Sequence, residues 1–518
     1  TGVGLALAET YLSDIFGSEI IDHYVYGIVS DGDLMEGVSF EAAELAGLWK
    51  LGKLIYIFDD NNISIDGNVD KVSVTDQSAK FKSLGWHVQE IDGHDETQII
   101  NAVKEAQDNT SKPSLIIAKS TIGKYSPNKQ NTSGVHGSPL GNDEMEKFLK
   151  NLGWFGDTFD HPQEIYEYFN EKRDTDNIQH DEWLSLLEDK KSTDDDFAKL
   201  WNQFHHKEIE LVNLHNNDNK ATRVAGSEVL KSIGESNRFI LGGSADLAAS
   251  TKQIISNSIY SYENRAGQSI EFGIREHAMA AVVNGITLHS NLIGYGSTFL
   301  VFSDYMRPSI RLASLMNLNS VYIFTHDSIY LGEDGPTHQP VEHLMSLRLI
   351  PGVDVIRPAN SIEVQYAYQY IFTKSNNPKS LVLTRQSLDY VETNLSYKNF
   401  QEGAYELIKG DDITIFASGS EVSLAIEVSK KLKNKSVQII STPILNQVNT
   451  DTLTNLKINE FVFTLELGRS IGWQDYIGKV TESFSIETFG KSAPQEDLTN
   501  YFEFSAEKIA EKILQHIS

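Results

Sequence analysis

Two apolar runs that lie close together in this sequence both end at residues able to bind a metal ion. Ile28–Val29 leads into Asp31, and Leu54–Phe58 leads into Asn61. An apolar run that stops at Gly, Asp or Asn is typical of a buried parallel strand that gives way to a loop. Ligands of open α/β sheets bind beyond the carboxyl ends of the strands. Because Mg²⁺ favours oxygen ligands and leaves positions for phosphate, Asp31, Asn61 and a nearby backbone carbonyl predict a metal that holds a diphosphate.

The alternative for each of these two segments is an ordinary turn. Asp-Gly and Asp-Asn pairs are common turn residues, and a single one of them would be a poor indicator of a metal site. Here two such ends each follow an apolar run, and a helix-like segment at residues 39–49 joins them. This repetition favours the metal site over two unrelated turns.

Composition and charge limit the class of protein. The chain has 518 residues, which is too long for one core and favours three domains of ordinary size. Its formal net charge of −28 argues against general binding of nucleic acid or of an anionic membrane. There is no cysteine, no apolar run long enough to span a membrane and no visible signal peptide. We therefore expect a soluble, cytoplasmic protein in which a local cluster of Arg and His binds any anionic substrate.

Apolar and helical segments alternate along most of the chain, which predicts an α/β fold with parallel βαβ units. We expect three domains: two doubly wound parallel-sheet domains and a smaller C-terminal α/β domain. The expected boundaries are 1–156 for the first domain, 157–220 for an acidic helical linker, 221–390 for the second domain and 403–518 for the third. The sequence opens at Thr1 in a helical pattern without methionine, so either the true start lies upstream or the form is naturally short.

A carboxylate begins one helix-like segment of the second domain. Glu276, in GIREHAMA, precedes a run of small residues. It could simply be a carboxylate favoured by the helix dipole. Alternatively, partial burial would raise its pKa and let it share a proton with a ring nitrogen.

Histidines mark two loops. The segment THDSIYLGEDGPTHQPVE holds His326 and His338 on either side of a Gly-Glu-Asp-Gly-Pro turn, which favours a functional loop on a rigid scaffold over two structural histidines. His136 lies in the Gly- and Pro-rich GVHGSPLG, and by itself it favours neither reading.

Aromatic and cationic residues complete the candidates. Phe299, Phe302 and Tyr305 have helical spacing, which is more often a core pattern, although an aromatic pocket for a flat ring is also consistent with them. Arg223, Ser250 and Arg385 are scattered, and each taken singly reads as a surface residue. Together with His326 they could hold a phosphate, because Arg binds such oxygens in a bidentate manner.

These motifs resemble the transketolase family of thiamine-diphosphate enzymes along the whole chain. The resemblance is carried by SDGDLMEG with DDNNISIDG, KPSLIIAKSTIG, VHGSPLG, GGSADLAAS, GIREHAMA, YGSTFLVFSDY, THDSIYLGEDGPTHQPVEHL, LTRQS and ASGSEV. The combination of GEDGPTHQP with the paired metal segments is highly specific.

The resemblance implies a role for each matching residue. The metal ligands would be Asp31, Asn61 and the carbonyl of Ile63. The cofactor would also contact Gly32, Glu36, Ile65, Glu276, Phe299, Phe302 and Tyr305. Catalytic roles would fall to Glu276, His136, His326 and His338. The sugar phosphate would be held by His136, Arg223, Asp246, Ser250, His326, Asp334, His338 and Arg385.

The activity implied is that of a transferase. A two-carbon ketol unit would pass reversibly from a ketose phosphate to an aldose phosphate through a carbanion adduct of thiamine diphosphate, as in the pentose phosphate pathway. The expected substrates are of the xylulose 5-phosphate and ribose 5-phosphate type, and the expected metal is Mg²⁺ or Ca²⁺. The family further implies a homodimer with its sites at the subunit interface and with Glu36 between them.

Two departures from the family pattern keep alternatives open. Ser30 replaces the first glycine of the usual Gly-Asp-Gly, and roughly the first hundred residues of the usual family chain are not in this sequence. One alternative is a related thiamine-diphosphate enzyme, such as dihydroxyacetone synthase or deoxyxylulose-phosphate synthase. The other is a cofactor-poor scaffold or partial subunit that needs a separate N-terminal chain.

Overall fold

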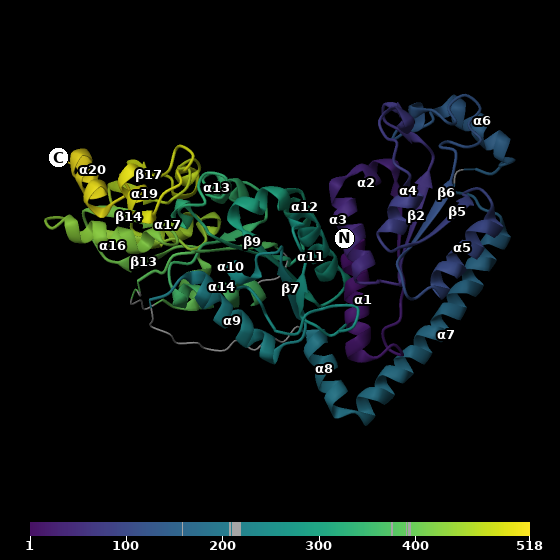
Figure 1. The fold of residues 1–518 in the computed structure, drawn as a ribbon, viewed down its shortest axis with the longest axis horizontal. Helices are drawn as coiled ribbons and strands as arrows, with labels where there is room; N and C mark the ends of the chain where they lie inside the picture. Colours follow the sequence, from purple (N-terminus) through teal and green to yellow (C-terminus); the bar gives the residue numbers. More distant parts are fainter. Residues whose placement is uncertain are drawn as a thin grey trace. The chain divides into compact units, whose positions relative to one another are not determined.

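The computed structural model describes residues 1–157, 159–206, 209, 219–373, 377–389, 391 and 395–517 (Figure 1). The chain divides into two compact units, Gly2–His206 and Lys207–Ser518, and Thr1 is grouped with the second.

A four-stranded parallel sheet forms the centre of the first unit, with the strand order β1-β2-β6-β5. Apolar stretches such as Leu54–Phe58 form these strands, and the helix-favouring stretches between them form the crossovers. Asp95 caps α5 by accepting hydrogen bonds from the backbone N–H groups of Thr97 and Gln98 at 2.9 and 3.1 Å. The strands of this sheet are β1 Val25–Ser30, β2 Leu54–Asp60, β5 His87–Asp92 and β6 Ser114–Lys119, and β3 Ile63–Ser64 forms a separate antiparallel pair with β4 Gly67–Asn68. The helices are α1 Gly2–Phe16, α2 Asp31–Met35, α3 Gly37–Leu48, α4 Gln77–Ser83, α5 Glu96–Asp108, α6 Asn142–Leu152, α7 Gln163–Thr193 and α8 Asp195–His206.

The helical segment expected at residues 39–49 begins earlier than its pattern indicated. It is divided into α2 and α3, which meet at Glu36, and α2 starts at Asp31 directly after β1. The side chain of Asp33 accepts hydrogen bonds from the backbone N–H and the hydroxyl of Ser30, each at 2.9 Å. This short polar turn starts a helix where the sequence predicted only a loop.

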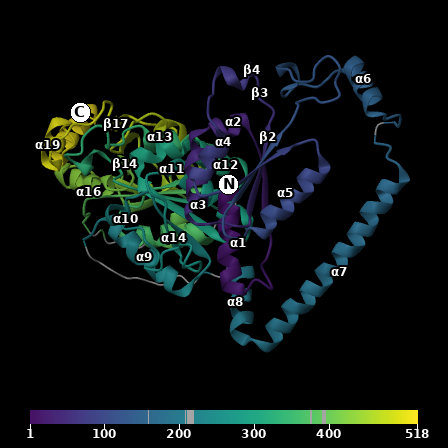
Figure 2. The same cartoon turned by 45° about the vertical axis from the view of Figure 1, so that its right-hand side comes forward.

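The acidic segment expected as a linker contains a helix of 31 residues, α7, which runs as one continuous rod (Figure 2). Most of its side chains are exposed, and one row of side chains attaches the helix to the rest of the first unit. Trp183 Nε1 donates to the carbonyl of Ile20 at 2.9 Å, Leu187 is buried, and Lys190 Nζ donates to the carbonyl of Phe16 at 3.2 Å. Spacings of four and seven residues place these three side chains on one helix face.

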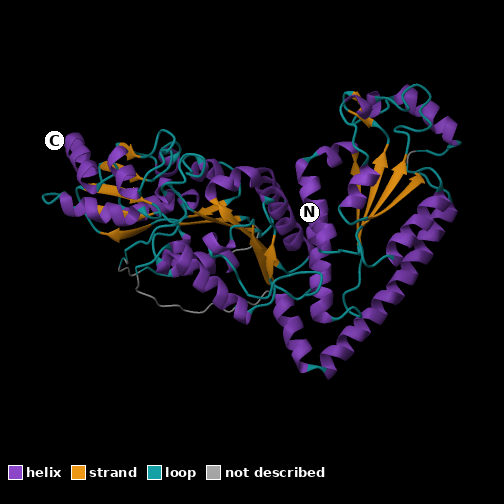
Figure 3. Ribbon diagram, viewed as in Figure 1, coloured by secondary structure: helices purple, strands orange, loops and turns teal. Residues whose placement is uncertain are grey.

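The second unit contains a six-stranded parallel sheet with the order β11-β12-β10-β9-β7-β8. Figure 3 shows its strands with helices on either side. The strands are β7 Ile240–Ser244, β8 Ser269–Glu271, β9 Ile293–Phe299, β10 Val321–Thr325, β11 Asp354–Ile356 and β12 Lys379–Leu383. The helices are α9 Thr222–Ser236, α10 Ala248–Thr251, α11 Glu276–His289, α12 Ser303–Leu315, α13 His343–Arg348 and α14 Ser361–Thr373, with the 3-10 turns η3 Leu300–Phe302 and η4 Ile329–Leu331.

The C-terminal part of the second unit has its own five-stranded sheet, in the order β13-β15-β14-β16-β17. Only β13 is antiparallel to its neighbour. The strands are β13 Tyr405–Ile408, β14 Ile413–Ala417, β15 Val437–Ser441, β16 Phe461–Leu465 and β17 Glu482–Phe484. The helices are α15 Tyr397–Gln401, α16 Glu421–Lys431, α17 Thr450–Leu456, α18 Trp473–Ile477, α19 Gln495–Tyr501 and α20 Ala506–Ile517.

The two apolar runs singled out in the sequence both lie in strands, Ile28–Val29 in β1 and Leu54–Phe58 in β2. The part of the chain that the structure describes holds no helix long and apolar enough to cross a membrane.

Close packing of α3 gives a test of the fold. A Cβ atom on Gly47 would lie 1.8 Å from the backbone oxygen of Leu84, whereas a Cβ on Gly37 of the same helix would meet nothing within 4 Å. We expect Gly47→Ala to destabilise the first unit by about 3 kcal/mol through overpacking against backbone. Gly37→Ala should change stability by no more than about 1 kcal/mol, in the stabilising direction. Urea unfolding of both variants measures the difference, and equal midpoints would contradict the packing of α3 on residue 84.

Candidate active site

The predicted metal ligands converge at the carboxyl ends of β1 and β2. These strands pair in parallel, with Ser30 opposite Asp59, so Asp31 begins α2 beside the turn that follows β2. Asn61 lies in that turn, where its side-chain oxygen accepts a hydrogen bond from the N–H of Ile63 at 2.9 Å and its amide donates to Asp59 at 2.9 Å. The structure therefore brings together the two segments that the sequence analysis predicted to form a metal site.

The charge around Asp31 favours a bound cation. One carboxylate oxygen of Asp31 is buried and has no hydrogen-bond partner. Burial and the neighbouring carboxylates of Asp60 and Asp59 raise the pKa of Asp31 to about 6. A divalent cation would relieve this repulsion and satisfy the unpaired oxygen.

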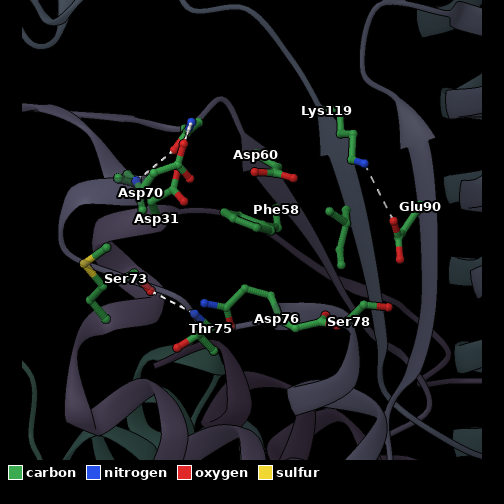
Figure 4. A pocket seen from close by; sticks show the side chains of 15 residues that line it. Asp31, Phe58, Asp60, Asp70, Ser73, Thr75, Asp76, Ser78, Glu90 and Lys119 are labelled. Atoms are coloured by element: carbon green, nitrogen blue, oxygen red, sulfur yellow. Dashed lines mark hydrogen bonds and ion pairs between the residues drawn. The ribbon is translucent and has the colours of Figure 1, made fainter.

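A cavity of about 360 Å³ adjoins Asp31 (Figure 4). Asp31, Asp60 and Asp70 lie along its upper side in the view, and Asp76 and Ser78 lie along its lower side. Lys119 also lines the cavity, 3.9 Å from Glu90. A diphosphate would be repelled by so many carboxylates unless a metal ion neutralised them, so the donor set fits a metal-bound diphosphate.

Three further residues predicted to contact the cofactor lie on the exposed side of this region. Ile65 is 72% exposed, and Gly32 and Glu36 are also exposed. A Cβ at Gly32 would approach only the Ser30 hydroxyl, at 3.9 Å. No described part of the chain therefore requires glycine there, and space beside the backbone remains open for a ligand.

His136 lies in a loop that a buried carboxylate organises. Glu144 accepts hydrogen bonds from the Ser126 hydroxyl at 2.5 Å and from the backbone and side chain of Asn128 at 2.8 and 2.9 Å. These hydrogen bonds lower the pKa of Glu144 to about 2, so it remains a charged acceptor. His136 itself is half-buried and follows a 3-10 turn at Ser133–Val135.

Three aromatic rings predicted to contact the cofactor lie close together in the second unit. Phe299 and Phe302 stack with centroids 5.9 Å apart, and Phe302 lies 6.1 Å from Tyr305. The helical spacing of these residues does not reflect one helix: Phe299 ends β9, Phe302 ends η3, and only Tyr305 lies in α12. Glu276 is 8% exposed and is the first residue of α11, as the sequence predicted.

Both predicted histidines of the loop after β10 contact this aromatic cluster. The ring of His326 lies 3.8 Å from that of Phe299, and the ring of His338 lies 5.6 Å from that of Phe302. His326 Nδ1 shares a 2.8 Å hydrogen bond with the Thr325 hydroxyl. Burial, followed by the charges of Arg223 and Arg385 and by His338, lowers the pKa of His326 to about 3. The His326 ring is therefore neutral at physiological pH and can act as a hydrogen-bond donor or acceptor without carrying charge.

The predicted phosphate-binding residues gather beside His326. Arg223 Nη1 donates to the carbonyl of Ser250 at 2.5 Å and lies 3.5 Å from His326 Nε2. Burial and the charge of Arg385 lower the pKa of Arg223. Two guanidinium groups near one neutral imidazole form a cationic site, which an anion would stabilise. Asp246 and Asp334 are both exposed, and Asp246 adopts a left-handed backbone with φ of 58°.

Three polar residues at the site were not singled out from the sequence. Asp60 adds to the charge at Asp31, and Thr325 hydrogen-bonds His326. The Gln339 amide donates to the carbonyls of Ile329 and Gly332, each at 3.0 Å, and so holds the loop that carries both histidines. The only sequence signal for Thr325 and Gln339 was their position beside His326 and His338.

Three family models match consecutive parts of the chain. The thiamine diphosphate binding domain of transketolase matches residues 1–208, the pyrimidine binding domain matches residues 218–390, and the transketolase-like C-terminal domain matches residues 403–505. The chain belongs to the transketolase family.

Individual relatives agree with this assignment. Transketolases of Staphylococcus aureus (strain MRSA252) and Bacillus subtilis (strain 168) are 39% and 37% identical over 99% of this chain, which covers 81% and 80% of their lengths. The crystal structure of a Pichia stipitis transketolase with sedoheptulose 7-phosphate matches with a TM-score of 0.95 and 34% identity, over 100% of this chain and 80% of that one. A Campylobacter jejuni transketolase structure matches with a TM-score of 0.92 and 33% identity, over 99% of this chain and 80% of that one.

The predicted fold class and activity are confirmed by these comparisons. The chain has the three-domain transketolase architecture and is a transferase of the transketolase type, which moves a two-carbon ketol unit between sugar phosphates. Its thiamine diphosphate binding domain identifies the cofactor.

The depressed pKa of His326 predicts how stability depends on pH. The unfolded chain binds a proton at this residue below a pH of about 6.5, whereas the folded chain does so only near pH 3. Stability should therefore fall as the pH is lowered from 6.5, by up to about 1.4 kcal/mol per pH unit. We expect His326→Gln to remove this component when unfolding is measured between pH 7 and pH 5. His180→Gln, on the exposed face of α7, is the matched control. If both substitutions changed the pH dependence of stability equally, the conclusion that burial lowers the pKa of His326 would be contradicted.

Proposed function

We propose that Asp31, Asn61 and the backbone carbonyl of Ile63 hold a divalent cation, Mg²⁺ or Ca²⁺, which binds the diphosphate of the cofactor. The observation that supports this most directly is the buried, unpaired oxygen of Asp31 among the carboxylates of Asp59 and Asp60. Gly32 and Ile65 would border the cofactor on the open side of this site.

The proposed role of Glu276 is to hold a proton at the aminopyrimidine ring. The residue is buried at the start of α11, where the N–H groups and dipole of a helix favour a carboxylate. Phe299, Phe302 and Tyr305 would pack against that ring. When bound, thiamine diphosphate supplies the carbon nucleophile and the electron sink that cleavage of a ketose requires.

The sugar phosphate would bind between the cations and the histidines of the second unit. Arg223 and Arg385, with Ser250, would hold the phosphate oxygens, because charge-assisted bidentate contacts are strong and directional. Asp246 and Asp334 would accept hydrogen bonds from sugar hydroxyl groups. His326, His338 and His136 would each donate hydrogen bonds to developing oxyanions and orient the substrate.

We further propose a homodimer whose sites are completed by the partner subunit, with Glu36 at the interface. Two apolar side chains beside the proposed pyrimidine site support this proposal. Ile274, two residues before Glu276, is 77% exposed, and Tyr305 is 63% exposed. Exposed apolar groups around a functional site are expected where a second copy covers them. Sedimentation equilibrium would reveal the dimer directly.

The proposed role of Glu276 is tested by a coupled assay of ketol transfer. The assay uses xylulose 5-phosphate and ribose 5-phosphate with thiamine diphosphate and Mg²⁺. We expect turnover that depends on both cofactors, and we expect Glu276→Gln to lower kcat by at least about 100-fold, within the range of general acid–base contributions. Glu271→Gln, at the exposed last residue of β8 in the same unit, is the control. Full activity of the Glu276 variant would remove that residue from its role. No turnover by the unsubstituted chain, with no binding of cofactor, would support the scaffold alternative.

The proposed metal site is tested by calorimetry with Mg²⁺ and thiamine diphosphate. Asp31→Asn should raise the apparent Kd for Mg²⁺ at least as much as loss of an outer-shell partner does, which is roughly 10–100-fold. Asp76→Asn makes the same change of charge in the same cavity and retains a good helix cap for α4, so its effect should be small. Equal effects of the two variants would indicate general electrostatics rather than a metal ligand.

A further inference from the structure

The loop between β10 and α13 is held by the C-terminal part of the chain at several points. This loop, residues 326–342, carries His326, Asp334 and His338. The hydroxyl of Thr499 donates to that of Tyr330 at 3.0 Å. The Gln339 amide donates to the carbonyl of Lys491 at 2.9 Å, and the Ser492 hydroxyl donates to the carbonyl of Glu333. The C-terminal part therefore contacts the loop over most of its length.

The strongest of these links is a buried ionic network at the start of the loop. Arg357 donates to one carboxylate oxygen of Asp327 through Nε at 3.0 Å and through Nη2 at 2.7 Å. Its third nitrogen donates to the carbonyl of Ser418 at 2.9 Å and to the carboxylate of Glu421. Asp327, Arg357 and Glu421 are each about 1% exposed. One guanidinium thus joins the residue after His326 to helix α16 of the C-terminal sheet.

A second buried pair fixes the end of α13. Arg348 donates to both carboxylate oxygens of Glu466, each at 2.7 Å. Glu466 also accepts from Trp473 Nε1 at 3.0 Å and from the Ser418 hydroxyl at 2.5 Å. Because Ser418 contacts both Arg357 and Glu466, the two pairs form one network.

Charge makes this network intolerant of partial removal. Burial by itself would lower the pKa of Arg357, but Glu421 and Asp327 raise it above its ordinary value. Removing one member of a buried ion pair leaves the other charge without compensation, which is more costly than the pair itself is stabilising. The arginine therefore remains charged and in place as long as both carboxylates are present.

The backbone of His326 requires such support. Its φ is 59°, a left-handed conformation that is unfavourable for residues other than glycine. A strained residue keeps its conformation only where its surroundings determine it fully. Arg357 donates hydrogen bonds to the side chain of Asp327, which directly follows His326 in the chain.

We propose that Arg357 is a positioning residue for ketol transfer: through Asp327 it fixes His326 toward the phosphate-binding arginines, and Glu421 of the C-terminal domain holds Arg357 in place. The C-terminal domain thereby contributes to catalysis without touching the substrate. This inference rests on the role proposed above for His326.

Two substitutions weaken the network with little change of shape. Arg357→Lys retains the positive charge but loses the fork that spans Asp327 and Glu421. Glu421→Gln keeps the shape of the side chain and removes its charge. The matched control is Glu363→Gln, because Glu363 is also a buried carboxylate that joins α14 to the C-terminal sheet. It accepts from Tyr405 at 2.7 Å and from Ser441 at 2.6 Å, and no hydrogen bond of the described residues links it to the loop.

The first measurement follows the His326 ring by NMR in the full chain with labelled histidine, and His326→Gln assigns its signal. The groups that face this ring are Arg223, Arg385, His338 and the Thr325 hydroxyl. In the unsubstituted chain the ring should remain neutral well below pH 6. In Arg357→Lys and Glu421→Gln the pKa should rise toward its ordinary value as the loop loosens and water reaches the ring. Glu363→Gln should leave the titration unchanged. An unchanged titration in both network variants would overturn the proposal.

The second measurement is a double-mutant cycle on kcat, with thiamine diphosphate and Mg²⁺ present. Arg357→Lys should lower kcat about tenfold, since small misplacements of a positioned group are costly. In the His326→Gln background the same substitution should lower kcat less than about twofold, because the residue through which it acts is gone. Equal losses in both backgrounds would show that Arg357 acts elsewhere and would also overturn the proposal. If the chain lacks turnover, the proposed residue roles fail, while the NMR titration still decides whether Arg357 positions His326.

Discussion

Parallel pairing of strands is the constraint on which the candidate site residues of each unit depend. In a parallel sheet every strand ends at the same edge, so residues that follow different strands become neighbours. Asp31 follows β1 and Asn61 follows β2, whereas Phe299 ends β9 and His326 follows β10. The register of the strands is therefore enough to bring residues that are far apart in sequence together, without any contact between their side chains.

The charge around the candidate residues has opposite signs in the two units. The chain carries a formal net charge of −28, yet Arg223 and Arg385 create a local cationic site beside a neutral His326. Around Asp31 the charge is the reverse, and the protein there needs a cation of its own. Each of these regions suits a phosphate group: the cationic region of the second unit can bind the anion directly, whereas the acidic region of the first unit requires a metal to do so.

The sequence could predict the elements and residues whose signals are local. The apolar run of β10 and the motif that contains His326 are contiguous, and the start of α11 at Glu276 follows from a run of small residues. Contacts between distant side chains have no such signal. No motif beside Arg357 in the sequence indicates that it pairs with Asp327 and with Glu421. The three residues meet only because each lies in a segment that follows a different strand. The start of α2 at Asp31 was also missed, since it depends on how Ser30 and Asp33 cap the turn.

The attachment of α7 constrains how the length of this region can vary. Lys190 reaches the last residue of α1 and Trp183 reaches Ile20 just after it, and both do so because seven residues make nearly two full helical turns. One inserted residue between them would rotate Lys190 by about 100° away from its acceptor. A seven-residue insertion would restore the rotation but move Lys190 about 10 Å along the helix axis, so the spacing between these two residues is fixed in both angle and length, whereas the exposed first half of the helix is free of that requirement.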